Sequence, residues 1–228
     1  RGLALSLWQQ IVNRRRVIYM MQVNGDILIR SVLLQAGFVS FLFFGAELGD
    51  VTLAANQVLL QFVYLASYAM DGFVFAAESL VGQAMGARAV AQLRRGASVT
   101  AVWAFGSALL MAAGSWLVGP FVIDVMAKDP TVQQAARLYL PHMVAAPLLG
   151  ALAWMLDGVF IGATRTQDMR NMMIVSFVVY WTAVWLFLPL WGNHGLWAAL
   201  LVSFLARGTT LSLRYPALEA AAKNHKQA

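Results

Sequence analysis

The chain has 228 residues, of which 61% are hydrophobic and only 11% charged, and its mean hydropathy is +0.68. This composition excludes an ordinary soluble domain and indicates a membrane protein with several spans. The net charge of +6 does not indicate a nucleic-acid partner, because the Lys and Arg residues fall between apolar segments and form no single basic surface, and the lack of Cys excludes disulfides, thiolate nucleophiles and Cys-ligated metals.

The first segment, residues 3–23, is apolar on both sides of an arginine run at 14–16. It is too charged to span a membrane and suits an interface, so residues 1–24 are predicted to form a cytoplasmic, amphipathic linker helix. The chain begins at Arg1 without a signal-peptide pattern, which suggests a start inside a longer protein or a processed start.

A first span is predicted at 27–46, and a second apolar stretch covers 51–86. At a rise of 1.5 Å per residue the second stretch is about 50 Å long, more than the ~30 Å hydrocarbon core but too little for two spans. It is therefore predicted to be one tilted or bent helix, with Gly72 as the candidate bend.

Further spans are predicted at 98–123, 131–163, 171–191 and 195–214. Pro141 and Pro147 each remove a backbone hydrogen bond and favour a kink in the fourth span. The predicted fold class is therefore an all-α integral membrane protein, with a six-helix transmembrane bundle over 25–216 and a polar cytoplasmic tail at 217–228.

The basic residues predict the orientation of these spans. Six spans place both ends on one side, and only Lys128 and Arg137 of the sixteen Lys and Arg residues fall on the other. The remaining fourteen include Arg30 and Arg207, assigned to their nearer helix ends. By the positive-inside rule, both termini are expected to be cytoplasmic, in the cytoplasmic (inner) membrane.

A polar seam runs along the second predicted span. Its members recur at alternating spacings of four and three, which places them on one face of a helix: Gln57, Gln61, Tyr64, Tyr68, Asp71, Phe75 and Glu78. Ionisable groups in such a segment are costly unless they are paired, protonated or wet. The seam is therefore expected to face a cavity or another helix.

Four charged residues are predicted to share one depth, about four to seven residues inside their helices: Arg30, Glu78, Asp157 and Arg207. They are expected either to pair across helices and stabilise the bundle, since an intramembrane charge needs a partner, or to form a gating network that breaks and reforms.

Asp71 is placed about 10 Å deeper than Glu78, with no basic residue predicted at its level. Burial without a counter-charge favours the protonated carboxyl group, so Asp71 is expected either to exchange protons or to stay neutral and bond a carbonyl group at the Gly72 bend. His142, near the outer end of the fourth span, is expected either to relay protons or to cap polar groups near Pro141.

The fourth span also has a face of small residues that suits close helix packing or leaves room for a ligand: Ala146, Gly150, Ala153 and Asp157. Four aromatic residues are expected to anchor the bundle at the membrane interface, with a binding cage as the alternative: Trp154, Tyr180, Trp181 and Trp185. The chain has no GxSxG, HExxH or Walker A pattern, so it is not expected to be an enzyme or to bind a metal.

Three strings carry a resemblance to a known family: LAANQVLLQFVYLASYAMDGFVFAAESLVGQAMGAR at 53–88, LDGVFIGATRTQDMRN at 156–171 and GNHGLWAALLVSFLARG at 192–208. The chain resembles the carboxyl-terminal half of the DinF-like branch of the multidrug and toxic compound extrusion (MATE) family. The resemblance implies a lobe of six helices that pairs with an amino-terminal lobe around a central cavity. It also implies export of xenobiotics, such as amphipathic organic cations, driven by the entry of protons or sodium ions.

By the same resemblance, Asp157 matches an acid in the tenth helix of the sodium-coupled branch, whereas the seventh-helix position offers Gln35 and no acid. This favours protons over sodium ions, with no cofactor. The proton-coupling candidates are Asp71, Asp157 and Glu78, and the cavity-lining candidates are Gln57, Gln61, Tyr64, Tyr68, Phe75 and His142. The rival hypotheses are a non-transporting scaffold, a lipid-handling half-protein and one half of a split transporter.

Overall fold

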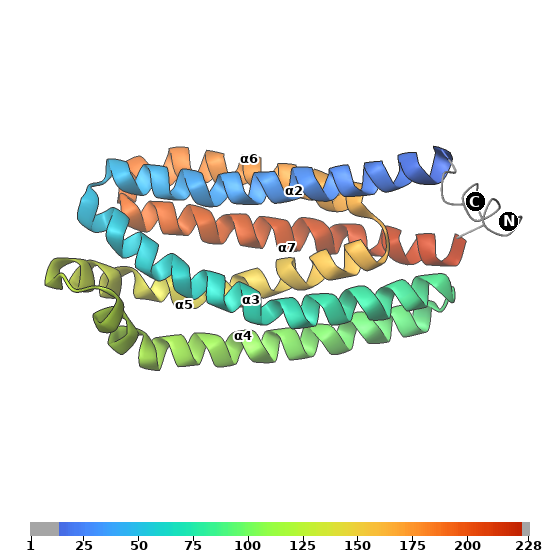
Figure 1. Cartoon of the computed structure of the whole chain (residues 1–228), viewed down its shortest axis with the longest axis horizontal. Helices are drawn as coiled ribbons and strands as arrows, with labels where there is room; N and C mark the ends of the chain where they lie inside the picture. Colours follow the sequence, from blue (N-terminus) through green and yellow to red (C-terminus); the bar gives the residue numbers. More distant parts are fainter. Residues whose placement is uncertain (1–13, 225–228) are drawn as a thin grey trace, which may run out of the picture.

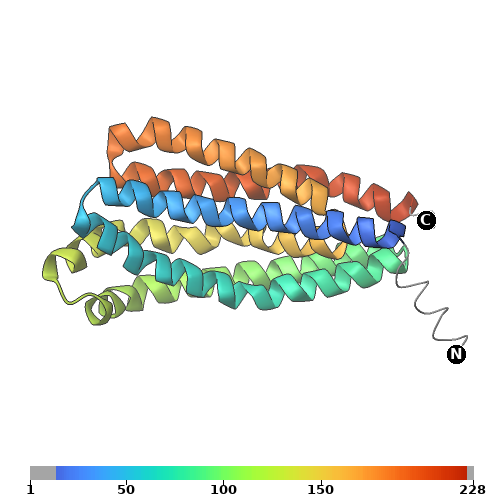
Figure 2. The same ribbon diagram turned by 45° about the horizontal axis from the view of Figure 1, so that its top comes forward.

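The computed structural model describes residues 14–224, and these residues form six helices. The helices are α2 (Arg14–Glu47), α3 (Asp50–Gly86), α4 (Val90–Met126), α5 (Pro130–Gly162), α6 (Thr166–Trp191) and α7 (Asn193–Asn224). All six are long and apolar enough to cross a membrane. They lie side by side in one elongated bundle, and the start of α2 and the end of α7 lie at the same end of it (Figures 1 and 2). The predicted six-helix membrane bundle is therefore confirmed.

Two helix boundaries differ from the prediction. Residues 14–23 do not form a separate interfacial helix, because α2 runs through them without a break into the first span; residues 1–13 lie outside the described part of the chain. The last helix continues to Asn224, so most of the predicted tail is helical. In both places residues that favour helix allow the α-helix to continue beyond the apolar segment. Hydropathy alone does not report this continuation.

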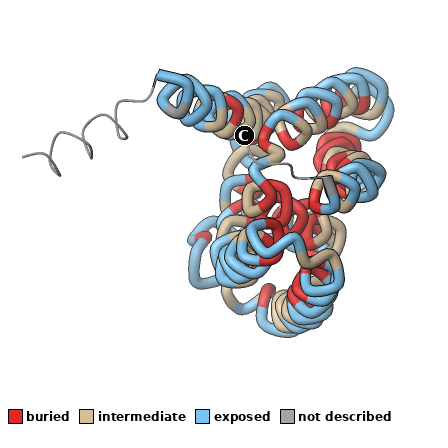
Figure 3. Tube along the Cα trace, turned by 90° about the vertical axis from the view of Figure 1, so that its right-hand side faces the viewer, coloured by how far each residue is buried: buried red, intermediate tan, exposed pale blue. Residues whose placement is uncertain are grey.

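The six helices form two groups of three. In one group α2 packs on α6 and α6 on α7, and in the other α3, α4 and α5 pack on one another. The groups meet chiefly through α5 and α7. Viewed along the bundle, buried residues lie where the helices meet and exposed residues face outward (Figure 3). Of the six spans, α5 is the most buried, so it is the central helix.

Glycine permits close backbone contact between α3 and α5. A Cβ atom on Gly158 of α5 would lie 2.3 Å from the carbonyl oxygen of Val74, and one on Gly162 would lie 2.3 Å from that of Glu78. Both carbonyl groups belong to α3, so the backbones of α3 and α5 touch at these positions. Spacing of two glycines by four residues is typical of closely packed membrane helices. The predicted small residues Ala146, Gly150 and Ala153 are also buried on α5.

Two polar arrangements fix the end of the bundle opposite the termini. Asn56 donates to Asn193 Oδ1 over 2.7 Å, and both Asn193 Nδ2 and Trp197 Nε1 donate to Asn56 Oδ1 over 2.9 Å, so this buried group ties α3 to α7. Asp129 caps α5 by accepting from the hydroxyl and backbone N–H of Thr131. The hydrogen bond from the Thr131 hydroxyl is the largest of the causes that hold the pKa of Asp129 below its usual value.

Candidate functional site

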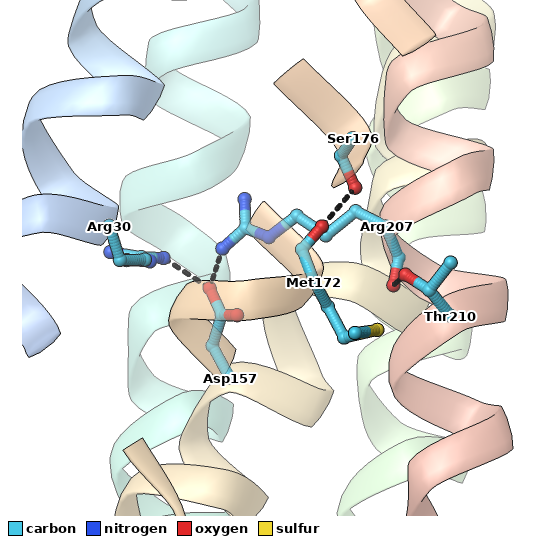
Figure 4. A network of polar contacts seen from close by, with 6 residues as sticks. All are labelled: Arg30, Asp157, Met172, Ser176, Arg207 and Thr210. Carbon is cyan, nitrogen blue, oxygen red and sulfur yellow. Dashed lines mark hydrogen bonds and ion pairs between the residues drawn. The ribbon is translucent and has the colours of Figure 1, made fainter. Parts of the chain in front are cut away.

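A three-residue charge cluster joins three helices inside the bundle. Arg30 of α2 and Arg207 of α7 both donate to one carboxylate oxygen, Oδ2 of Asp157 on α5. Asp157 lies between the two guanidinium groups (Figure 4). The side chains of Asp157 and Arg207 are each only 3% exposed, whereas that of Arg30 is 19% exposed. Arg30 is thus the member of the cluster that water or a ligand can reach.

The hydroxyl groups near this cluster bond to the helix backbone. Ser176 donates to the carbonyl oxygen of Met172 over 2.8 Å, and Thr210 donates to that of Ala206 over 2.7 Å. Thr210 also lies 3.2 Å from the carbonyl oxygen of Arg207 (Figure 4). Bonds of this kind satisfy a hydroxyl donor within a membrane helix. These hydroxyl groups therefore do not compete with the arginines for Asp157.

A cavity of about 250 Å³ opens beside the cluster, between α2, α3 and α5. We call it the polar cavity. Three charged side chains line it, Arg30, Asp71 and Asp157. Its remaining walls include four aromatic residues, Phe38, Tyr64, Phe75 and Trp154. A mostly apolar hollow with a few convergent polar groups is the usual form of a small-molecule site.

The predicted polar seam divides between this cavity and the surface of α3. Tyr64, Asp71 and Phe75 line the cavity. Gln57, Gln61 and Tyr68 are exposed on the outside of the bundle, on a face that no other helix within residues 14–224 covers. Part of the seam therefore lines a cavity, as expected, and part of it is left for lipid or for another protein segment.

The structure brings together three of the four charges expected at one depth and leaves out the fourth. Glu78 forms no ion pair with any residue of the described chain. It lines a separate hollow with Gln83 of its own helix and with Gly162 and Thr164 from the end of α5. The physical reason is that Asp157 already receives both arginines, while Glu78 faces the closely packed end of α5.

Asp71 was expected to have no basic residue at its level, and the structure corrects this. Arg30 lines the same cavity as Asp71. Depths counted from the predicted helix ends missed this proximity, because α2 begins well before its apolar segment and an arginine side chain extends over more than one helical turn. Within residues 14–224, Asp71 accepts no hydrogen bond at the Gly72 bend or elsewhere.

His142 does not belong to the polar cavity. Its ring lies 5.1 Å from that of His194, and the His194 ring lies 4.9 Å from that of Tyr139. This aromatic group joins α5 to the start of α7, at the end of the bundle away from the termini. Both expected roles of His142, as a proton relay and as a cap of polar groups near Pro141, stay predictions.

Two further buried polar groups were not singled out in the sequence. Asp26 is 4% exposed and pairs with Arg170 over 2.5 Å while it accepts from Thr166 over 3.0 Å. Asn56 lies at the centre of the arrangement described above. An acid at the edge of an apolar span could have pointed to Asp26 in the sequence. It was missed because residues 1–24 were predicted to be a separate helix, with 25–26 as its boundary.

Exposure divides the four predicted aromatic anchors into two pairs. Trp181 and Trp185 are exposed, at 42% and 82%, as lipid-facing residues are. Trp154 and Tyr180 are 7% and 2% exposed, so they are core residues, and Trp154 lines the polar cavity. Position along a helix does not reveal which face is covered, and this decides between anchor and core.

The fold and the site define a class of protein: an integral membrane bundle of six helices with charged groups around a cavity between three of them. The chain matches the MatE family over residues 27–185, and it belongs to that family.

Relatives of known name agree with this assignment. The chain is 38% identical over 206 residues to DNA damage-inducible protein F of Escherichia coli strain K12, covering 88% of this chain and 43% of that protein. It is 29% identical over 184 residues to a probable multidrug resistance protein, NorM, of Pseudomonas aeruginosa, covering 74% of this chain and 36% of NorM. The chain therefore spans less than half of the length of these relatives.

A solved structure has the same fold. The bent form of the Vibrio cholerae MATE transporter VcmN superposes with a TM-score of 0.85, at 18% sequence identity, over 96% of this chain and 50% of VcmN. At this identity the likeness concerns the fold alone. It matches this bundle to one half of a larger transporter.

Proposed function

We propose that the chain forms one lobe of a secondary-active exporter, which moves xenobiotics and other amphipathic organic compounds out of the cell in exchange for protons. The observation that carries this proposal is the polar cavity, where two carboxyl groups, Asp71 and Asp157, face a hollow with aromatic walls inside a membrane bundle. Ionisable groups in such places mark ion and substrate pathways. Tyr64 and Phe75 would contact the substrate within the cavity, and Gln57, Gln61 and Tyr68 would extend its path along α3.

The proposal includes a second lobe of six helices. This lobe would lie against the polar face of α3 that no other described helix covers. The relatives are more than twice as long as the region matched, and transporters of this kind work by rocking two repeats around a central site. Protons are proposed over sodium ions because two guanidinium groups already occupy Oδ2 of Asp157. A sodium ion at that carboxylate would have to compete with two cations.

Asp71→Asn is expected to leave the protein folded but to reduce proton-driven export and flatten its pH dependence. The amide has nearly the size of the carboxyl group and resembles its protonated form, so it removes proton exchange and little else. The measurement is drug efflux from energised vesicles across about pH 5.5 to 8. The protein used in this experiment is the whole product of the natural gene.

The matched control is Asp124→Asn, which neutralises an exposed acid paired with Arg137 at the far end of the bundle. It should leave both the rate of efflux and its pH profile unchanged. An unchanged pH profile in Asp71→Asn would remove Asp71 from the coupling step, and a large fall in melting temperature would show that its charge serves folding instead.

The proposed orientation places both termini in the cytoplasm of a cell whose inner membrane holds the bundle. Because the chain has no Cys, single cysteines can test this directly. Leu48→Cys, in the exposed turn between α2 and α3, is expected to react with an impermeant thiol reagent added to intact cells. Ala91→Cys and Gln167→Cys, both exposed at the end that holds the termini, should react only after the cells are opened. The opposite pattern of labelling would reverse the orientation.

A further inference from the structure

Hydrogen-bond donors greatly exceed acceptors in the Arg30, Asp157 and Arg207 cluster. Two guanidinium groups carry ten N–H donors, whereas one carboxylate offers about four acceptor positions. Nε of Arg30 and Nη1 of Arg207 are buried without a hydrogen-bond partner. Oδ1 of Asp157 is also unpartnered, but it could serve only part of this excess. The cluster therefore has room for a second acceptor and one positive charge more than its acid balances.

A candidate for that acceptor among residues 14–224 is Asp71. It lines the same cavity as Arg30 and Asp157. Arg207 is not among the residues that line this cavity, so only Arg30 can turn between the two acids. The other groups facing Asp71 are Asp157 from α5 and Tyr64 from its own helix, while α4 contributes no charged residue to the cavity.

We propose that Arg30 is an exchangeable counter-ion for Asp71. When Asp71 is protonated, Arg30 and Arg207 share Asp157, which is the arrangement in the structure. When Asp71 loses its proton, Arg30 turns to Asp71 and leaves Arg207 paired with Asp157. In the second arrangement each arginine has one acid, so the four charges balance.

The exchange would change which helix holds α2. The backbone of α2 packs chiefly on α6, and the ion pair with Asp157 ties it to α5. Transfer of Arg30 to Asp71 would tie α2 to α3 instead. Two discrete pairings whose balance depends on one proton are the kind of element that couples proton binding to a change of packing. Arg30 is thus a positioning residue, and this role rests on the proposed proton coupling at Asp71.

The side-chain NMR signal of Arg30 tests the exchange. The product of the natural gene is placed in lipid nanodiscs with isotope-labelled arginine, and the Arg30 signal is assigned by its loss in Arg30→Lys. We expect this signal to shift in one transition when the pH is varied between about 5 and 9, and to stay constant in Asp71→Asn. The Arg207 signal should change little, because Arg207 keeps Asp157 throughout. The control Asp124→Asn should retain the Arg30 transition.

Export measured across pH gives a second readout. Arg30→Lys keeps a positive charge and should retain the pH dependence, whereas Arg30→Gln should lose it, as Asp71→Asn does. The proposal is overturned if the Arg30 signal is flat in the unmodified protein, if its transition persists in Asp71→Asn, or if the transition depends on exchanging chloride for gluconate, which would make a solution anion the second acceptor. Because the NMR experiment involves no transport, the exchange can fail or succeed independently of the proposed export.

Discussion

Gly158→Leu and Gly162→Leu are each expected to destabilise the bundle strongly. At both positions a Cβ atom would lie 2.3 Å from a carbonyl oxygen of α3, and a backbone cannot move aside as a side chain can. Overpacking a core typically costs about 1 to 3 kcal/mol even where side chains adjust. Separation of α3 from α5 would also weaken the packing of α4, which contacts both, so we expect a loss at or above that range.

The measurements are the yield and the melting temperature of the detergent-solubilised protein. Both are monitored by fluorescence during size-exclusion chromatography. A loss of about 3 kcal/mol corresponds to a fall of roughly 6 to 12 °C in a domain of this size. Gly106→Leu is the matched control, because a Cβ atom at this position would have no neighbour within 4 Å and the residue faces outward on α4. Melting of Gly158→Leu at the unmodified temperature would show that α3 and α5 do not touch at this point.

Asp157→Asn should produce an effect at least as large. It leaves Arg207, with 3% of its side chain exposed, and Arg30 without the acid that both contact. Removing one partner of a buried ion pair typically costs about 3 to 5 kcal/mol, because a charge stays buried without compensation. We expect a large fall in melting temperature and a loss of cooperative unfolding.

Two comparisons separate this cost from the general effect of a lost charge. Arg30→Gln should be much milder, since it leaves Arg207 and Asp157 as a balanced pair. Glu78→Gln should be close to neutral, because Glu78 has no ion pair within residues 14–224. Equal falls in melting temperature for Asp157→Asn and Glu78→Gln would contradict the view that the cluster consists of three residues, and would restore Glu78 to it.

The sequence by itself determined the membrane class, the six spans and the family. Apolar segments of about 20 residues must form helices in lipid, because only a helix satisfies every backbone group within the segment, and their number and spacing can be counted directly. The seven-residue seam on α3 could also be recognised in the sequence, because helical periodicity is a local property. Asp157 was likewise recognisable as an intramembrane acid in need of a partner.

Only the tertiary structure decided which partners these groups have. Arg30, Asp157 and Arg207 lie on three helices, and their contact depends on helix tilt, rotation and the direction of each side chain, none of which is set by distance from a helix end. The same holds for Asp71, which shares a cavity with Arg30, for Glu78, which does not join the cluster, and for Trp154, which is core and not anchor. Depth along a helix is a local quantity that hydropathy reports, whereas the facing of two side chains arises only when the helices pack, so the charge cluster and the polar cavity became apparent only in the folded bundle.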